Sequence, residues 1–472
     1  MRQLVVWAIA ALLATALAGC GGTHSTTSST TGAATAETTS STTVPNNSGA
    51  GTGANGTTTP AGRSTSAWPT YHHDSTRAGV AAAGPALGNV RRLWSEQVDG
   101  AVYAEPLVVG GRVIVATEND SVYAFDAATG RQVWQAHLGT PVPGGDLPCG
   151  NIDPSGITST PVVDPRAGVV YAVTFQPFEH RLVALDLGTG RVRWQRPIDP
   201  PGADPHTHQQ RAALALSHGL IYISYGGLYG DCGDYHGWVL GAPASGPTGQ
   251  VYSYQVPTAR EGAVWEPSGP AVDSAGNLYV ATGNGSSTSS FDFGNAVIRL
   301  TPTLQQTAFF APSNAPAMSS IDQDLGSTGP LLLPGSRAFI IGKNGVGYLL
   351  STSRLGGIGH PLASRTVCDA AFGGDAYAQG TIYVPCTGGI VAVRLAADQL
   401  APVWTQSAAT FPPILAGPGL WAVGGQTLYQ LDPGSGGVRF SAPIGEPAHF
   451  ATPAADDGRI FIAAAGRVYA FG

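Results

Sequence analysis

The stretch ALDLGTGRVRW, from Ala184 to Trp194, decides the fold because a close copy, AFDAATGRQVW, occupies Ala124 to Trp134. The second copy starts 60 residues after the first. Each copy follows a strand-like run, RVIVAT before the first and GVVYAVTF before the second. Each unit therefore fits a strand, a tight Asp-x-x-Thr-Gly turn and a strand that ends in tryptophan. Units that recur at this interval predict a repeat architecture.

Weaker copies of the same pattern extend through the rest of the chain, as QLDPGSGGVRF at 430–440 and AVIRLTPTLQQTAFF at 296–310. Four-stranded units at this spacing are typical of a β-propeller. We predict an all-β fold with eight blades in a single domain over residues 68–472. The blades are expected to open near Tyr103, Ser159, Arg211, Gly269, Thr328, Ala370, Pro413 and Phe450.

The last blade is incomplete, because the chain ends at VYAFG, Val468 to Gly472, where other copies continue into a turn and a tryptophan strand. The missing strand is available near the other end, in VRRLWSEQV, Val90 to Val98. We expect this strand to pair with the C-terminal strands and close the ring. Closure removes the exposed sheet edges that cause aggregation.

The composition agrees with a large β domain. The 472 residues include 65 glycines and 36 prolines, which indicate many turns, while only 11 % of residues are charged. The net charge is −7 and no basic stripe is present, so nucleic acid is excluded as a partner. We find no Gly-x-Ser-x-Gly motif and no P-loop.

The N-terminus predicts export. A short apolar core from Leu4 to Leu17 leads into Leu-Ala-Gly-Cys, which resembles the lipobox of bacterial lipoproteins. This resemblance implies a signal peptide over residues 1–20 and a lipid on Cys20. An ordinary secretory signal is the alternative. Residues 21–67 are almost all Thr, Ser, Gly, Ala and Asn, and they predict a disordered tether, with glycosylation left open. We therefore expect an extracytoplasmic protein anchored by lipid at the cell membrane.

Four further cysteines suggest disulfides in an exported chain, although four free thiols are the alternative. Cys368 and Cys386 flank one short strand pair, so we pair them with each other. This choice leaves Cys149 to pair with Cys232.

The pattern A-x-D-x-x-T-G-x-x-x-W resembles the tryptophan-docking repeat of pyrroloquinoline quinone (PQQ) propellers, the quinoprotein alcohol dehydrogenase-like family. In that family Asp, Thr and Gly close the turn, and Trp packs between neighbouring blades. The resemblance covers nearly all of residues 68–472. The matching positions are Asp126, Thr129, Gly130 and Trp134 in the first copy and Asp186, Thr189, Gly190 and Trp194 in the second.

Three stretches resemble the family's cofactor site. In GKNGVGYLL, Lys343, the only lysine of the chain, falls on the cation that contacts the quinone. In LYVATGNGS, Asn284 falls on a metal ligand. In SSIDQDLGSTGP, Asp322 falls on the catalytic base and Asp324 on a lanthanide ligand. The resemblance thus implies PQQ with calcium or a lanthanide, whose metal polarises the quinone.

The same region also departs from the family. The third blade, GGLYGDCGDYHGW, lacks the glutamate that binds the metal, and the adjacent cysteine pair is reduced to Cys149. The tryptophan beneath the quinone has no counterpart in Glu266–Asp273, and Trp265 lies nearby but out of register. No Cys-x-x-Cys-His is present for a c-type haem. A chain without any cofactor fits these departures equally well.

Each of these matches also has a structural explanation. Lys343 precedes an Asn-Gly pair, which is a strong hairpin signal, and Asn284 lies in a Gly-Asn-Gly turn. The two aspartates could simply solvate a loop. The histidines of YHHD (71–74) and PHTHQQR (205–211) are expected to be structural.

Two classes of function remain. The first is a binding or scaffold lipoprotein with an incomplete catalytic site, whose axial face holds a protein or glycan partner; we expect a monomer. The second is a PQQ- and metal-dependent alcohol or sugar dehydrogenase with a reduced site. A polysaccharide-binding propeller is a third possibility. The enzyme hypothesis requires Lys343, Asn284 and Asp322 to converge on one axial cavity.

Overall fold

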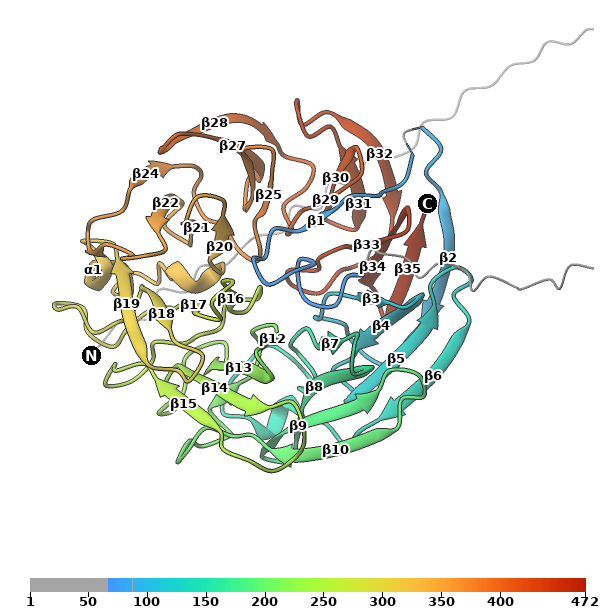
Figure 1. Ribbon diagram of the computed structural model, residues 1–472, viewed down its shortest axis with the longest axis horizontal. Helices are drawn as coiled ribbons and strands as arrows, with labels where there is room; N and C mark the ends of the chain where they lie inside the picture. The colour runs from blue at the N-terminus through green and yellow to red at the C-terminus, as the bar shows by residue number, and fades with distance from the viewer. Residues whose placement is uncertain (1–66, 87) are drawn as a thin grey trace, which may run out of the picture. The chain divides into compact units, whose positions relative to one another are not determined.

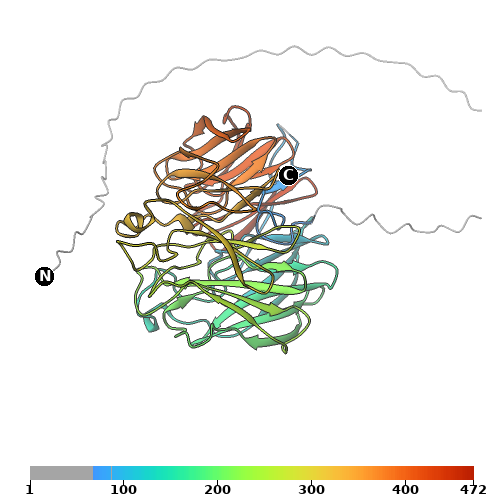
Figure 2. The same cartoon turned by 60° about the vertical axis from the view of Figure 1, so that its left-hand side comes forward.

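The computed structural model describes residues 67–86 and 88–472, so the predicted signal peptide, Cys20 and most of the predicted tether lie outside the described residues. The described strands form eight small sheets of four or five strands. Figure 1 shows them arranged around a common centre, and in Figure 2 the green and orange halves lie on opposite sides of it. The predicted eight-bladed all-β propeller is therefore confirmed.

The first four blades follow one another along the chain, each running from the axis to the rim. Their elements are β3 (Leu107–Val109), β4 (Arg112–Ala116), β5 (Ser121–Asp126) and β6 (Gln132–His137), then η1 (Gly144–Asp146), β7 (Val162–Asp164), β8 (Val169–Gln176), β9 (Glu179–Asp186) and β10 (Val192–Pro197), then β11 (His208–Gln209), β12 (Ala215–Ser217), β13 (Leu220–Gly227), β14 (Trp238–Pro243) and β15 (Tyr252–Gln255), then β16 (Ala271–Val272), β17 (Leu278–Ala281), β18 (Val297–Leu300) and β19 (Gln306–Ala311).

The second four blades complete the ring. Their elements are α1 (Ala315–Ser319), η2 (Leu325–Ser327), β20 (Leu331–Leu333), β21 (Arg337–Ile340), β22 (Val346–Ser351), β23 (Gly357–Ile358) and β24 (Ala363–Thr366), then β25 (Ala376–Ala378), β26 (Thr381–Cys386), β27 (Gly389–Ala396) and β28 (Gln399–Gln406), then β29 (Ile414–Ala416), β30 (Gly419–Gly424), β31 (Thr427–Leu431) and β32 (Val438–Pro443), then β33 (Ala454–Asp456), β34 (Arg459–Ala464) and β35 (Arg467–Phe471). Each innermost strand begins within a few residues of the predicted position.

The eighth blade takes its outer strand from the N-terminal part of the chain, as predicted. β2 (Arg92–Gln97) pairs antiparallel with β35, with Trp94 opposite Ala470. Trp94 is buried and donates its indole N–H to the carbonyl of Ala127, 3.1 Å away in the first blade. The two distant ends of the domain are therefore joined by backbone bonds and by a packed side chain.

The repeated turns at the rim connect successive blades. The carboxylate of Asp126 accepts hydrogen bonds from the N–H and hydroxyl of Thr129, and Gly130 closes the turn with a φ of +77°. In the second copy, a Cβ added to Gly190 would lie 2.5 Å from the Trp134 ring, which donates its N–H to Leu187. Glycine is needed because the tryptophan of the preceding blade covers the turn.

Trp194 packs differently from the other two tryptophans, since it joins an apolar cluster shared with the third blade and meets no glycine. A further docking pair connects Trp404 to Gly436 in the weaker copy, with an indole hydrogen bond of 3.2 Å to the carbonyl of Pro433. The turn was expected from the sequence, whereas its docking tryptophan was not.

The segment Trp68–Ala81, which we call the axial segment, lies at the centre of the ring (Figure 1). Its backbone and side chains bond to every blade in turn. The contacted residues are Val108, Val163, Leu214, Val272, Leu332, Tyr377, Leu415 and Thr452. It ends in β1 (Val80–Ala81), which pairs parallel with β29. The expectation that YHHD packs against the propeller is confirmed.

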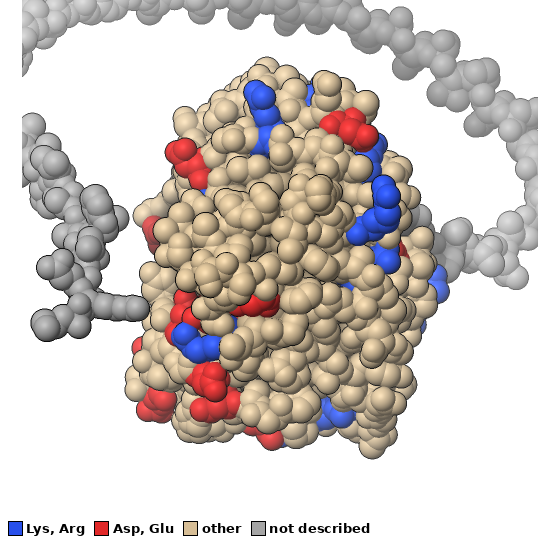
Figure 3. Space-filling view, turned by 90° about the vertical axis from the view of Figure 1, so that its left-hand side faces the viewer, with Lys and Arg blue, Asp and Glu red and all other residues tan. Residues whose placement is uncertain are grey.

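The surface of the propeller is sparsely charged. Figure 3 shows one side of the molecule, with acidic and basic side chains in small groups separated by wide uncharged areas. None of the helices in the described ranges is long and apolar enough to cross a membrane.

Candidate functional site

A cavity of about 580 Å³ opens on the axis of the ring. Residues from most of the blades line this cavity. The shape of the cavity therefore depends on closure of the whole ring and cannot be formed by one blade alone. Its charged and aromatic lining includes Tyr103, Arg211, Trp265, Lys343, Phe372 and Phe450. Trp265, which is out of register in the sequence, therefore does line the cavity, and Lys343 Nζ lies 5.8 Å from its ring centroid.

Lys343, Asn284, Asp322 and Asp324 meet on one wall of this cavity. Lys343 Nζ lies 2.8 Å from Asp322 Oδ1 and 2.6 Å from Asp324 Oδ2. The side-chain amide of Asn284 donates to the same Asp322 oxygen at 2.8 Å. The convergence that the sequence analysis required is therefore present, although it does not by itself assign a chemical role to any of the four.

Local backbone geometry explains how these side chains meet. Lys343 follows β21 and precedes an Asn344-Gly345 turn, in which Gly345 has a φ of +66° and Asn344 accepts the N–H of Val346 at 3.1 Å. The predicted turn is thus present and also presents the lysine to the cavity. The N–H of Lys343 bonds to the carbonyl of Asp324 at 2.9 Å, which holds the loop between α1 and η2 against the turn.

The two aspartates differ in how far their side chains are exposed to solvent. The side chain of Asp324 is 9 % exposed and that of Asp322 is 70 % exposed. Burial raises the pKa of Asp324, and the nearby ammonium opposes this rise. Burial alone would lower the pKa of Lys343, but the two carboxylates raise it overall, so the lysine stays protonated.

These residues do not fit a calcium or lanthanide ion. Such ions take six to eight oxygen ligands. Here Asp324 Oδ1 accepts the N–H of Asn284 at 2.6 Å and its other oxygen contacts the ammonium, while the amide oxygen of Asn284 accepts from Asn295 at 3.2 Å. In the described ranges, no three His, Cys, Asp or Glu side chains gather to hold a metal. The Lys343 ammonium contacts an oxygen of each carboxylate and balances one of their two charges.

The floor of the cavity carries a second cation that the sequence analysis missed as a site residue. The Arg211 guanidinium lies 5.4 Å from the ring centroid of Tyr103 and 4.8 Å from that of Phe450, within cation–π distance of both. Phe450 stacks in turn on Phe372, with centroids 5.7 Å apart.

A positional signal could have identified these residues. Tyr103, Arg211, Phe372 and Phe450 each lie four positions before the innermost strand of their blade, namely β3, β12, β25 and β33. The chain enters each blade at the axis, so this position faces the centre of the ring. A large aromatic or charged residue there indicates an axial lining residue.

A smaller void of about 10 Å³ lies on the other side of Arg211. It is bounded by Tyr103, Arg211 and Phe450 from the cavity floor and by Tyr71 from the axial segment. This void therefore lies between lining residues of the cavity and Tyr71 of the axial segment.

A disulfide joins two loops at the cavity. Cys149 and Cys232 are bonded, with Cα atoms 6.2 Å apart, and their neighbours Asn151 and Asp231 line the cavity. Cys368 and Cys386 form the other disulfide. Both predicted pairings are confirmed, and they are typical of a chain that folds outside the cytoplasm.

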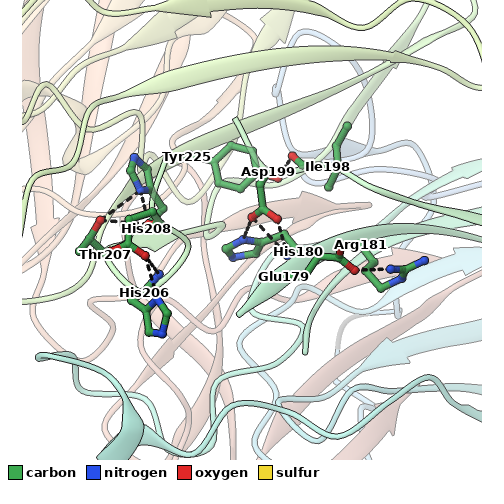
Figure 4. Close-up of polar contacts among 10 residues, drawn as sticks. Glu179, His180, Arg181, Ile198, Asp199, His206, Thr207, His208 and Tyr225 are labelled. Atoms are coloured by element: carbon green, nitrogen blue, oxygen red, sulfur yellow. Dashed lines mark hydrogen bonds and ion pairs between the residues drawn. The ribbon is translucent and has the colours of Figure 1, made fainter. Parts of the chain in front are cut away.

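The histidines of the third blade are used structurally, as expected. His206 Nδ1 lies 2.7 Å from Asp204, and His208 Nδ1 lies 2.8 Å from the Asp204 carbonyl. Figure 4 shows His206 and His208 separated from His180, which pairs with Asp199.

Comparison with known proteins agrees with the repeat pattern and the fold. Residues 28–226 match the family described as outer membrane protein assembly factor BamB. The quinohemoprotein alcohol dehydrogenase from Comamonas testosteroni superposes with a TM-score of 0.66 at 16 % identity, covering 86 % of this chain and 80 % of that one. The chain is a PQQ-repeat β-propeller. BamB from Moraxella catarrhalis has the same fold, with a TM-score of 0.56 at 14 % identity, covering 81 % of this chain and 98 % of that one.

Curated relatives of this PQQ-repeat propeller include quinone-dependent alcohol dehydrogenases and outer membrane protein assembly factors. The dehydrogenase subunit of alcohol dehydrogenase (quinone) from Gluconacetobacter polyoxogenes is 30 % identical over 149 residues, which are 30 % of this chain and 19 % of the relative. Outer membrane protein assembly factor BamB from Burkholderia pseudomallei is 32 % identical over 125 residues, or 26 % and 28 % of the two chains. The chain thus spans less than a third of the relatives it matches.

Proposed function

We propose that this propeller is an exported binding module whose axial cavity holds a ligand without redox chemistry. The observation that carries the proposal is the Lys343 ammonium, bound to both Asp322 and Asp324. This internal cation pairs with both carboxylates and balances one of their two negative charges, so it competes with a metal ion for the same oxygens. The cavity itself is large and is lined by apolar aromatic groups together with a few charged ones, as binding sites for small molecules are.

The proposal includes anchoring by a lipid on Cys20, with residues 21–67 as tether, and a monomeric propeller. The supporting observations are the Leu-Ala-Gly-Cys sequence and the two disulfides. The partner could be a protein or a glycan on the axial face, since relatives named outer membrane protein assembly factor share the repeat.

A second candidate is a PQQ-dependent dehydrogenase with a reduced site. The convergence of Lys343, Asn284, Asp322 and Asp324 on one cavity favours it, as does the similarity to quinone-dependent alcohol dehydrogenases. In that case Lys343 would contact the quinone, Asp322 would accept a proton from the alcohol, and Asn284 and Asp324 would hold the metal. The present contacts of the ammonium with both aspartates oppose this assignment.

Equilibrium binding of PQQ, with calcium or with lanthanum, separates the two candidates. We expect no metal-dependent binding to the wild type, measured by fluorescence quenching and calorimetry. Lys343→Ala removes the internal cation and serves as the paired variant, with Arg365→Ala on exposed β24 as the control. Tight metal-dependent binding by the wild type that is lost in Lys343→Ala would establish the dehydrogenase candidate instead.

A further inference from the structure

Arg211 is a cation without a counter-ion at the floor of the cavity. Its one hydrogen bond within the described residues runs from Nη2 to the carbonyl of His449, at 3.3 Å, and no carboxylate lies within ion-pair distance. A guanidinium has five N–H donors, so most of those on Arg211 have no protein acceptor. Lys343, in the same cavity, has two carboxylate partners.

Among the described residues, the carboxylate that acts electrostatically on Arg211 is Glu118, and one of its oxygens is bound elsewhere. Glu118 Oε2 accepts the N–H of Gly156 at 2.7 Å and the hydroxyl of Thr158 at 3.1 Å. Burial lowers the pKa of Arg211, but a guanidinium keeps its charge at neutral pH. Arg211 is partly buried, and a partly desolvated charge without a partner is costly, so an anion entering the cavity would relieve that cost.

Other residues of the cavity lining have the opposite character. Asp231 and Asp322 both line the cavity, and a carboxylate only accepts hydrogen bonds. Asp322 Oδ2 has no partner within the described residues, and Asp231 accepts from the Tyr235 hydroxyl through Oδ1 alone. The Asn151 and Gln209 amides also line the cavity, and an amide both donates and accepts. These polar groups fit a ligand rich in hydroxyl groups.

The aromatic residues add a third constraint. Trp265, Phe372 and Phe450 come from three blades and present apolar faces to one cavity. Such faces pack against the C–H groups of a saturated ring, such as that of a sugar, as well as against flat aromatic rings. A flat molecule with carboxylates around its whole edge would set acceptors against Asp231 and Asp322, and those contacts are repulsive.

We infer that the cavity binds an acidic saccharide, with its carboxylate on the Arg211 guanidinium, its hydroxyls on Asp322 and Asp231, and its ring against the aromatic wall. This assignment rests on the proposed binding function and specifies its ligand class. The cavity volume of about 580 Å³ suits a short oligosaccharide of this kind.

The test compares digalacturonic acid, its methyl ester and the neutral galactose disaccharide of the same linkage, by calorimetry on the purified protein. We expect the acid to bind about tenfold more tightly than the ester or the neutral sugar, as a charge-assisted Arg–carboxylate pair would give. Arg211→Met should abolish that preference, whereas Arg365→Met, on the exposed strand β24, should retain it. The methyl ester removes the charge from the ligand, so this arm does not depend on how well Arg211→Met folds.

Equal affinity for the acid and its ester would overturn the assignment and leave the binding function intact. Absence of binding by all three saccharides would also overturn it. Metal-dependent binding of PQQ in the separate experiment would overturn the binding function as well, so the two failures are distinguishable.

Discussion

At the rim of the propeller Trp134 reaches only the turn of the next blade, whereas at the axis Arg77 contacts carbonyls from distant parts of the chain. Trp134 covers Gly190 and bonds to Leu187 in the adjacent blade. Arg77 donates to Pro270, Tyr71 and Leu214. Rim contacts are repeated from blade to blade, while the axial contacts occur once each.

This difference teaches where the molecule tolerates change. Loss of one rim contact leaves similar contacts at other blades, so its effect is local. Loss of an axial contact removes a hydrogen bond that no other blade repeats. The partner is buried there, so water cannot take the place of the missing donor. The four predictions below test this contrast.

The largest effect is expected for Arg77→Leu, at the axis. Arg77 is 2 % exposed, and its charge faces the buried Glu105 and Glu266. Removing it takes the donor from three carbonyls and the nearby positive charge from these two acids, so the free energy of unfolding should fall by about 3–5 kcal/mol. Urea denaturation measures the loss. Arg92→Leu on exposed β2 is the control and should change stability by less than about 0.5 kcal/mol. Similar losses in both variants would remove the distinction between axis and rim.

The second prediction concerns pH. Burial, together with the Glu118 charge, raises the pKa of Asp120 to about 8, against an opposing hydrogen bond from Phe175. Folding raises the pKa of Asp120, so its contribution to the free energy of unfolding is most favourable below about pH 4, where both states are protonated. That contribution is lost progressively as the pH rises towards 8. Stability should fall by roughly 2–3 kcal/mol between pH 5 and pH 8 on account of this group.

Asp120→Asn keeps the group neutral at every pH and supplies the comparison. The variant should unfold at a higher urea concentration than the wild type at pH 8, with a smaller difference at pH 5 and the smallest below about pH 4, where the unfolded state also holds the proton. Parallel stability curves for the two proteins would show that Asp120 does not titrate in this range.

The third prediction isolates one rim contact. Gly190 and Gly202 have nearly the same φ, +71° and +74°, but an added Cβ would collide with Trp134 only at Gly190. Replacement by alanine at either position should therefore cost a similar amount of backbone conformational free energy. Gly190→Ala should lose about 1–3 kcal/mol more than Gly202→Ala, because the packed ring must shift. Equal losses, measured by denaturation, would mean that the docked ring moves aside freely.

The smallest effect is expected within the cavity itself. Asp322→Asn changes a carboxylate that is 70 % exposed, so stability should change by less than about 0.5 kcal/mol. Asp324→Asn changes a buried carboxylate that bonds to both Asn284 and Lys343, and it should cost about 1–2 kcal/mol. A reversed order in thermal unfolding would show that the exposed aspartate holds the lysine.

The sequence predicted the rim well because its contacts are local. One Asp-x-x-Thr-Gly turn contains its own hydrogen-bond donors and acceptors. The eleven-residue repeat alone was therefore enough to predict that Asp126 and Thr129 form this turn. Strand β2 could be assigned to the last blade because that blade lacked a tryptophan strand.

The axis was predicted only in part. Lys343, Asn284 and Asp322 were expected to meet, and they do, but the lysine turned out to bind both aspartates directly. That contact depends on the folding of three separate loops, which no short motif encodes. Arg211 and Phe450 carry no motif at all, and their role follows only from their position before an innermost strand.

The axial segment also determines how the propeller would respond to a pulling force. The chain enters the described domain at Trp68 and immediately bonds to Val108, Val163 and then the remaining blades. A force applied at the N-terminus, such as one from a membrane anchor, would therefore reach the centre of the ring before any outer strand. Bonds to successive blades would share the load, so we expect the mechanical strength of the domain to exceed that of a strand peeled from its rim.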